Sequence, residues 1–277
     1  MMTLAFVLAA IFQLPPQKSD AVIGVAAVDL QSGQRISVRS TERFPMGSVY
    51  KVPIALEVLH RVDSGTLRLD RVLTIEPKDF APGWSPLRDA AKGQPIVLTV
   101  GELAEHMVKV SDNTASDALL RLVSPMAVTR RMAELGAGGI RVDRLEREMA
   151  ADLRKPGGVE RYAIDARDTA TPDETLALFT LIAQKRERLS DASHEKLMRW
   201  MTETKTGANR IKAGVPQGVV VAHKTGTMPG TTNDAAILNR RIVLVIFTKR
   251  STSPDEDAEA DIAAVARAAY DALTRSP

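Results

Sequence analysis

The chain has 277 residues, of which 44% are hydrophobic, enough for one substantial core or for two lobes that share one. Its 37 basic and 34 acidic residues are nearly balanced and only 4% of residues are aromatic, which argues against a nucleic-acid-binding surface. The absence of cysteine excludes disulfides, thiolate catalysis and cysteine-based zinc sites. The four histidines show no metal-binding spacing, so we expect neither a metal nor another cofactor.

Residues 1–20 contain an apolar run from Thr3 to Phe12, far shorter than the ~20 residues that a membrane-spanning helix needs. This run is similar to the apolar part of a secretory signal, although a basic start and a clear cleavage site are missing. The alternative is an N-terminal helix that packs on the core and ends at Pro15-Pro16. We favour export, and therefore predict a periplasmic or secreted protein without stable membrane insertion.

Two β-rich ends flank a helical middle. Residues 21–30 and 35–39 are short stretches rich in valine and isoleucine, and they predict a hairpin. Near the other end, residues 218–223, 234–238 and 241–248 predict three further strands. Between these ends we expect helices.

Capping signals mark several of these helices. Residues 99–102 form a capping box, and residues 171–174 predict a second one with proline at the first helical position. The last helix is predicted to begin after Ser253-Pro254, because three carboxylates follow where they favour the positive end of a helix.

This arrangement predicts an α+β fold, an α/β sandwich in which one five-stranded antiparallel sheet is built from both ends of the chain. An all-helical lobe is inserted into the sheet structure, and the active site lies between the two parts. We expect residues 21–45 and 205–277 to form the α/β lobe and residues 46–204 the helical lobe. Within the helical lobe, residues 153–166 are the one extended loop candidate.

The first chemical motif is Ser48-Val49-Tyr50-Lys51. If a helix begins at Ser48, the spacing of three places Lys51 one turn on, on the same face. Free backbone N–H groups at a helix start can hold an oxyanion, and a buried neutral lysine can accept the serine proton. The alternative is a capped helix with a surface lysine, since a chain of this length holds about one such spacing by chance.

Two further motifs carry similar alternatives. Ser111-Asp112-Asn113 lies on a turn between two helical stretches, where it either relays a proton and binds a substrate amide or simply caps a helix. Lys224-Thr225-Gly226 follows a predicted strand. Its ammonium and hydroxyl can bind a substrate carboxylate while the glycine allows close approach; the alternative is a solvated strand end.

Together the three motifs outweigh these alternatives, because they occur in this order near the start, middle and end of the chain. The set is typical of class A β-lactamases and penicillin-binding proteins. The sequence resembles the class A β-lactamase family over about residues 23–269, including Arg43-Phe44-Pro45-Met46 before the serine and Asp143-Arg144-Leu145-Glu146 in the family's Ω-loop region. The resemblance implies a monomeric hydrolase whose substrate is a small molecule, a β-lactam antibiotic.

The resemblance also implies a role for each matching residue. Ser48 attacks the β-lactam ring with Lys51 as its partner, and Ser111 passes a proton to the leaving nitrogen. Glu146 activates the water that hydrolyses the acyl-enzyme, and the backbone N–H groups of Ser48 and Thr227 hold the oxyanion. Substrate contacts come from Asn113, Lys224, Thr225, Gly226, Thr227, Arg210 and Trp84, and the Ω-loop, at about residues 144–168, is closed by an ion pair of Arg144 with Asp168.

Three of these residues have a simpler alternative reading. Glu146 would then be a solvated loop charge, Arg210 a surface residue, and Trp84 a cover for the helical lobe.

Two features depart from the family. Ala150 stands four residues after Glu146, where the family has an asparagine that helps to hold the hydrolytic water, and alanine cannot hydrogen-bond through its side chain. Losing one such anchor slows deacylation by about 10- to 1,000-fold. The stretch from Arg144 to Asp168 is also longer than usual, which either supplies another water ligand or reshapes the cleft.

The alternatives for function follow from these departures. A penicillin-binding D-Ala-D-Ala peptidase uses the same serine and lysine but does not need Glu146. A β-lactam-binding protein acylates and then stalls, and Ala150 favours that reading while Glu146 argues against it.

Overall fold

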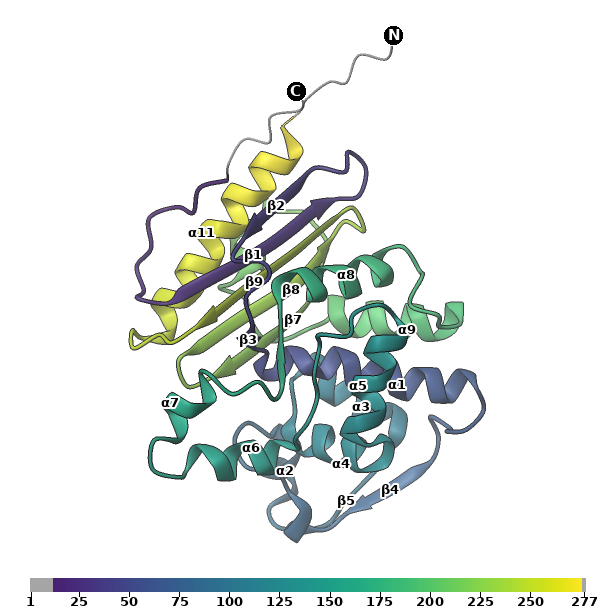
Figure 1. Cartoon of the computed structure of the whole chain (residues 1–277). Helices are drawn as coiled ribbons and strands as arrows, with labels where there is room; N and C mark the ends of the chain where they lie inside the picture. The colour runs from purple at the N-terminus through teal and green to yellow at the C-terminus, as the bar shows by residue number, and fades with distance from the viewer. Residues whose placement is uncertain (1–11, 276–277) are drawn as a thin grey trace.

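The computed structural model describes residues 12–275 (Figure 1). Its centre is a five-stranded antiparallel sheet with the strand order β2-β1-β9-β8-β7. The strands are β1 (Val22–Asp29), β2 (Arg35–Val38), β7 (Val221–Met228), β8 (Thr231–Leu238) and β9 (Ile242–Lys249). Because the first and last parts of the chain share this sheet, the predicted α+β architecture is confirmed.

The edge strand β7 differs from its prediction. The sequence places a strand at residues 218–223, but β7 begins at Val221 and continues to Met228. Its ladder with β8 pairs Lys224 with Ala235 and Thr225 with Asp234. The third motif is therefore part of the strand itself and not a solvated strand end.

Each face of the sheet is covered by helices. Alternate residues of β1 divide between two hydrophobic clusters, with Val25 and Ala27 on one face and Ala26 and Val28 on the other. The outer cluster, which contains Val25, is covered by α10 (Ile211–Gly214) and α11 (Asp255–Thr274). The inner cluster, which contains Ala26, is covered by α1 (Lys51–Asp63), α8 (Pro172–Ala183) and α9 (Asp191–Thr202).

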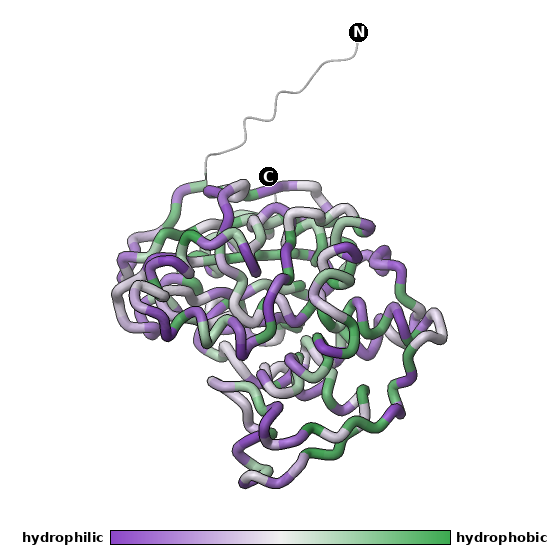
Figure 2. The backbone as a smooth tube through the Cα atoms, turned by 60° about the horizontal axis from the view of Figure 1, so that its bottom comes forward, coloured by the Kyte–Doolittle hydropathy of each residue, from purple (hydrophilic) through white to green (hydrophobic). Residues whose placement is uncertain are grey.

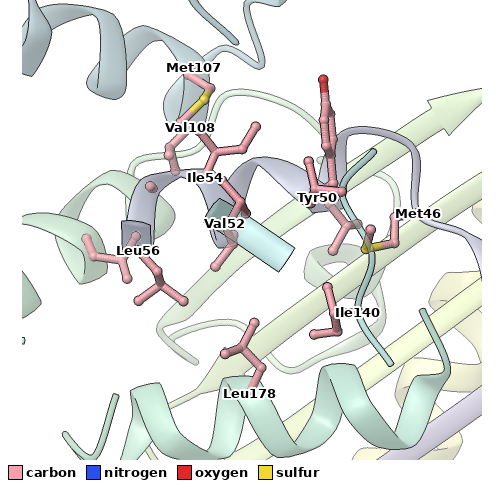
Figure 3. Close-up of a cluster of buried hydrophobic side chains, with 14 of the residues drawn as sticks. Met46, Tyr50, Val52, Ile54, Leu56, Met107, Val108, Ile140 and Leu178 are labelled. Carbon is pink, nitrogen blue, oxygen red and sulfur yellow. The ribbon is translucent and has the colours of Figure 1, made fainter. Parts of the chain in front are cut away.

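Helix α1 runs through the middle of the inner cluster. Buried side chains reach it from segments far apart in the chain, among them Met107, Ile140 and Leu178 (Figure 3). Short hydrophobic and hydrophilic stretches alternate along the backbone throughout the body (Figure 2). The remaining helices are α2 (Pro86–Ala91), α3 (Val100–Lys109), α4 (Asn113–Val123), α5 (Pro125–Glu134), α6 (Glu146–Leu153) and α7 (Gly158–Tyr162), with short 3₁₀ turns at Gly47–Tyr50 and Pro77–Asp79.

The inserted part is not all-helical, and the prediction is wrong in this detail. A two-stranded ladder joins β4 (Val72–Ile75) to β5 (Ile96–Thr99), and a second joins β3 (Phe44–Pro45) to β6 (Thr169–Ala170). The first pair consists of four-residue runs with many β-branched side chains, which favour strands. The segment 153–166 is also not a plain loop, because it contains α7.

The two predicted capping boxes have different outcomes. At Thr99 both reciprocal hydrogen bonds with Glu102 are present. At Thr171 the hydroxyl accepts from the backbone N–H of Glu174, but the glutamate carboxylate does not return a bond to the backbone. The second box is therefore only a one-sided cap.

Residues 12–20 contain no helix. Phe12 and Leu14 pack against the outer cluster, and Ser19 donates a hydrogen bond from its hydroxyl to Asp261 on α11 at 2.6 Å. The rest of the predicted segment 1–20 lies outside the described residues. Within residues 12–275 no helix is long and apolar enough to cross a membrane.

Candidate active site

A cleft of about 670 Å³ lies between the edge strand β7 and the helical part of the chain. Its walls bring together residues from all three motifs and from the Ω-loop. The predicted site residues that line it are Ser48, Trp84, Ser111, Asn113, Glu146, Arg210, Thr225 and Thr227. Lys51, Lys224 and Gly226 are buried beneath these residues.

Ser48 stands in a 3₁₀ turn, Gly47–Tyr50, that leads directly into α1. Its side chain is half-buried and faces the cleft, whereas the residues on either side of it are buried. The segment before it is tied to the sheet by Asn233 of β8, whose amide donates to the carbonyls of Pro45 and Met46 at 2.8 and 3.1 Å. The fully buried Asn233 therefore fixes where the serine lies relative to the sheet, a role that its sequence context did not reveal.

Two glycines allow this turn to touch β7 backbone to backbone. A Cβ atom at Gly226 would lie 2.2 Å from the carbonyl oxygen of Met46, and one at Gly47 would lie 3.1 Å from the backbone nitrogen of Thr227. Gly47 also has a positive φ of 51°, which favours glycine. The backbone nitrogens of Ser48 and Thr227 therefore both lie at this contact between the turn and β7.

Lys51 is fully buried, one turn after the serine. Its ammonium group donates to the carbonyl oxygen of Ser111 at 2.7 Å and to Oδ1 of Asn113 at 2.7 Å. It also lies 3.2 Å from Oε1 of Glu146. The structure thus joins the first motif, the second motif and the Ω-loop glutamate through a single side chain, and the alternative of a surface lysine is wrong.

Ser111 lies between the two buried lysines. Its hydroxyl accepts from Nζ of Lys224 at 2.9 Å and lies 3.5 Å from Nζ of Lys51. Ser111 has a φ of 61°, a strained conformation for a residue other than glycine and one that is common at functional sites. Burial, with the neighbouring charge of Lys51, lowers the pKa of Lys224 well below its usual value.

Glu146 is buried at the first position of α6, only 6% exposed. Its backbone N–H donates to Oδ1 of Asp117 at 2.6 Å, and the next N–H, from Arg147, reaches the other oxygen at 3.3 Å. Asp117 is fully buried, and this burial together with the charge of Glu146 raises the pKa of Asp117 to about 6. Asp117 therefore holds the backbone at Glu146, the candidate catalytic residue, although no sequence motif pointed to this role.

The predicted Ω-loop is closed by a cluster of charges around the buried Arg144 and Asp168. Nε of Arg144 donates to Asp168 at 2.6 Å, and its Nη1 contacts Asp152 at 2.8 Å and Asp165 at 3.3 Å. Asp168 also accepts the backbone N–H groups of Asp143 and Arg144. The loop therefore closes through three carboxylates on one guanidinium, two of them from within the long stretch itself.

Only the two turns of α6 in this loop reach the cleft. Glu146, Ala150 and Leu153 of α6 line it, at a spacing that places all three on one face of the helix. Residues 154–165 are absent from the lining among the described residues. The longer stretch therefore places no side chain where it would replace the missing asparagine at Ala150.

Arg210 lies behind β7 and is only 5% exposed, so the alternative of a surface residue is wrong. Its guanidinium donates to the carbonyls of Gly226 and Asn233 and to the hydroxyl of Thr227 at 2.7 Å, and Glu259 of α11 pairs with it at 2.9 Å. Next to it, the hydroxyls of Thr225 and Thr206 are 2.6 Å apart. Hydroxyls backed by a guanidinium suit a substrate carboxylate.

Trp84 and Asn113 form the opposite wall. The Trp84 side chain is 61% exposed, and its indole N–H donates to the carbonyl of Val110 at 2.7 Å. Nδ2 of Asn113 donates to the carbonyl of Pro82 at 3.1 Å. The second motif is also a helix cap, because Asp112 accepts the backbone N–H of Ala115. The capping interpretation is therefore confirmed, and Ser111 and Asn113 of the same motif also line the cleft.

The fold and the cleft together define a serine hydrolase with a buried lysine and a buried glutamate at the start of α6. A family model described as the β-lactamase enzyme family matches residues 4–273. The chain is 35% identical over 261 residues to the carbapenem-hydrolyzing β-lactamase KPC of Klebsiella oxytoca, covering 91% of this chain and 84% of that protein. It is 32% identical to the extended-spectrum β-lactamase PER-1 of Pseudomonas aeruginosa, covering 90% and 82%.

Among solved structures, the class A β-lactamase of the last common ancestor of Gram-negative bacteria superposes with a TM-score of 0.81. The two chains are 36% identical, and the match covers 91% of this chain and 94% of that one. The chain belongs to the β-lactamase enzyme family, and the predicted family is confirmed. It is a serine β-lactam hydrolase of class A.

Proposed function

We propose that Ser48 and Glu146 hydrolyse β-lactams in two steps, acylation and deacylation. In the first step, Oγ of Ser48 attacks the β-lactam carbonyl carbon and the C–N bond of the ring breaks. Lys51 takes up the serine proton, with Glu146 at 3.2 Å as the acceptor through which the lysine releases its own. The single observation that carries this proposal is the convergence of Lys51 on Ser111, Asn113 and Glu146.

Ser111 delivers a proton to the ring nitrogen as it leaves. Its hydroxyl is held by Lys224 at 2.9 Å, so it can pass on a proton and recover one from the neighbouring ammonium groups. The developing oxyanion is held by the backbone N–H groups of Ser48 and Thr227. Thr225, Thr227 and Arg210 bind the substrate carboxylate.

Before the second step, Lys51 gives its proton to Ser111 and takes back the one held by Glu146, so Glu146 is again a carboxylate. In the second step Glu146 removes a proton from water, the water oxygen attacks the ester carbonyl, and the ester bond to Oγ of Ser48 breaks. Oγ then takes up a proton from Lys51, which Glu146 protonates again. Glu146 is buried, lines the cleft, and has its Oε1 3.2 Å from Nζ of Lys51, which supports its use as a base. Ala150 leaves the water with one anchor fewer on the same helix face. We therefore propose turnover limited by deacylation, with Ala150→Asn raising that rate about 10-fold or more.

Stopped-flow kinetics with nitrocefin, combined with intact-protein mass spectrometry, tests this proposal. We expect a burst followed by steady turnover in the wild type, an acyl adduct that persists in Glu146→Gln, and no adduct in Ser48→Ala. A wild-type burst with no further turnover, and an adduct that persists, would instead favour a penicillin-binding peptidase or a β-lactam trap. An unmodified Ser48 in both the wild type and Glu146→Gln would refute the nucleophile.

We also propose that the protein acts as a monomer after export from a bacterial cell. The support is that its relatives come from Klebsiella oxytoca and Pseudomonas aeruginosa, and that residues 1–20 are similar to a signal segment. Light scattering of the purified protein and N-terminal mass analysis of cell fractions test the two statements separately.

A further inference from the structure

A second, shallower pocket of about 390 Å³ lies beside the catalytic cleft, and its charged lining is entirely basic. It is lined by Lys78, Arg88, Arg147 and Arg154 together with Phe80, Ala81 and Pro82. Pro82 lines the cleft as well, so the two spaces meet on opposite sides of one residue. None of these four cations belongs to the proposed catalytic machinery.

Helix α6 presents adjacent faces to the two spaces. Glu146, Ala150 and Leu153 face the cleft, whereas Arg147 and Arg154, seven residues apart, share the neighbouring face. The short helix α6 and its C-cap residue Arg154 therefore carry the catalytic glutamate on one side and two guanidinium groups on the next.

The wall between the spaces is the segment 78–82, and its carbonyls are held from both sides. Arg147 donates to the carbonyl of Phe80 at 3.3 Å, and Arg88 donates to that of Ala81 at 3.0 Å. From the cleft side, Asn113 donates to the carbonyl of Pro82 at 3.1 Å. Asn113 is one of the substrate contacts that the family resemblance implies, and we expect it to bind the amide of the substrate's acyl side chain. The basic pocket therefore adjoins the end of the cleft where that side chain projects.

The four charges are not equally compensated. Arg88 pairs with Asp89 at 2.7 Å, and Nε of Arg147 lies 3.7 Å from Asp117. Lys78 and Arg154 are exposed, and within the described chain neither has a carboxylate within ion-pair distance. Two uncompensated cations at the mouth of a pocket attract an anion over about 10 Å at moderate salt.

We propose that this basic pocket selects β-lactams whose acyl side chain carries a second anionic group, such as a carboxylate. This inference rests on the proposed function, because it assigns the acyl end of the substrate to the Asn113 wall. The reacting carbonyl and the common β-lactam carboxylate stay at β7, so the pocket acts on substrate binding and hence on KM more than on kcat.

Three penicillins that differ only at the α-carbon of the acyl group test the proposal. Benzylpenicillin carries hydrogen there, carbenicillin a carboxylate and ampicillin an ammonium group. Lys78→Gln and Arg154→Gln are each expected to lower kcat/KM for carbenicillin about 3-fold, and the double variant about 10-fold, through KM. Benzylpenicillin should change less than 2-fold, and the discrimination should shrink in 0.5 M salt.

Arg267→Gln on α11 is the matched control, because it removes an exposed arginine on the far side of the sheet. Lys78→Glu supplies a second readout, since reversing the charge should raise kcat/KM for ampicillin relative to carbenicillin. An equal loss for all three penicillins would overturn the proposal in favour of general attraction of their common carboxylate. An unchanged substrate ratio would also overturn it, whereas no turnover of benzylpenicillin by the wild type would contradict the proposed function instead.

Discussion

Replacing Asp117 with asparagine isolates the free-energy cost of burying a second carboxyl group beside Glu146. Asp117 is fully buried, and its pKa is raised to about 6 from an ordinary value of 3.8. This difference corresponds to about 3 kcal/mol of destabilisation once the group is ionised in both the folded and the unfolded protein. The asparagine keeps the acceptor for the N–H of Glu146 but loses that for Arg147, which costs about 1 kcal/mol.

The pH dependence of this cost has a definite sign. Between pH 4 and pH 6 the folded protein keeps the Asp117 proton while the unfolded chain releases it, so this group's contribution to stability falls as the pH rises. Because asparagine does not titrate, Asp117→Asn should gain stability relative to the wild type by about 2 kcal/mol on going from pH 4.5 to pH 7.5.

Urea unfolding followed by tryptophan fluorescence at the two pH values measures this gain, with the slope m checked for a common denatured state. Glu146→Gln is the control, since removing that charge lowers the pKa of Asp117. The pH range over which Asp117 is protonated in the folded protein but ionised in the unfolded chain then becomes narrower. A stability difference between Asp117→Asn and wild type that is the same at pH 4.5 and 7.5 would refute the assignment of a raised pKa to this carboxyl.

Three further substitutions test how the site is held together. Gly226→Ala should lower kcat/KM at least 100-fold, because its Cβ would lie 2.2 Å from the carbonyl oxygen of Met46 and force the oxyanion hole apart; an active variant would contradict this geometry. Asn233→Ala should lower the free energy of unfolding by about 2 to 4 kcal/mol and slow acylation, as measured by urea unfolding and burst kinetics. Asp168→Asn should lower the free energy of unfolding by about 3 kcal/mol and slow deacylation more than acylation, because Arg144 keeps two other carboxylates but loses its fully buried one. Equal losses in both steps would argue against an effect specific to the loop.

Much of the fold followed from local patterns. The hairpin of β1 and β2, the strand β9 and the helix after Ser48 were all predicted, because alternating apolar residues and capping residues act over a few positions. The ladder of β4 with β5 was missed, since each strand has only four residues and its partner lies beyond the local pattern.

The residues of the site also differ in how well the local sequence predicted them. Ser48, Lys51 and Glu146 belong to motifs with recognisable spacing, and the structure places them together at one cleft. Asn233 and Asp117 act by holding backbone groups of other segments, and such contacts exist only after the chain has folded. A lone asparagine in a strand or aspartate in a helix gives no local sign of its distant partner.

The shared sheet also fixes the order in which the molecule can assemble. β1 is flanked by β2, which follows it closely, and by β9, which lies at the other end of the chain. Asp29 and Arg241, 212 residues apart, form an ion pair across this junction at 2.8 Å. During synthesis β1 and β2 therefore exist first as a two-stranded hairpin, which is marginally stable on its own. Closing so long a loop places this protein among the slower folders, and the central strand pairing must wait until nearly all of the chain has left the ribosome.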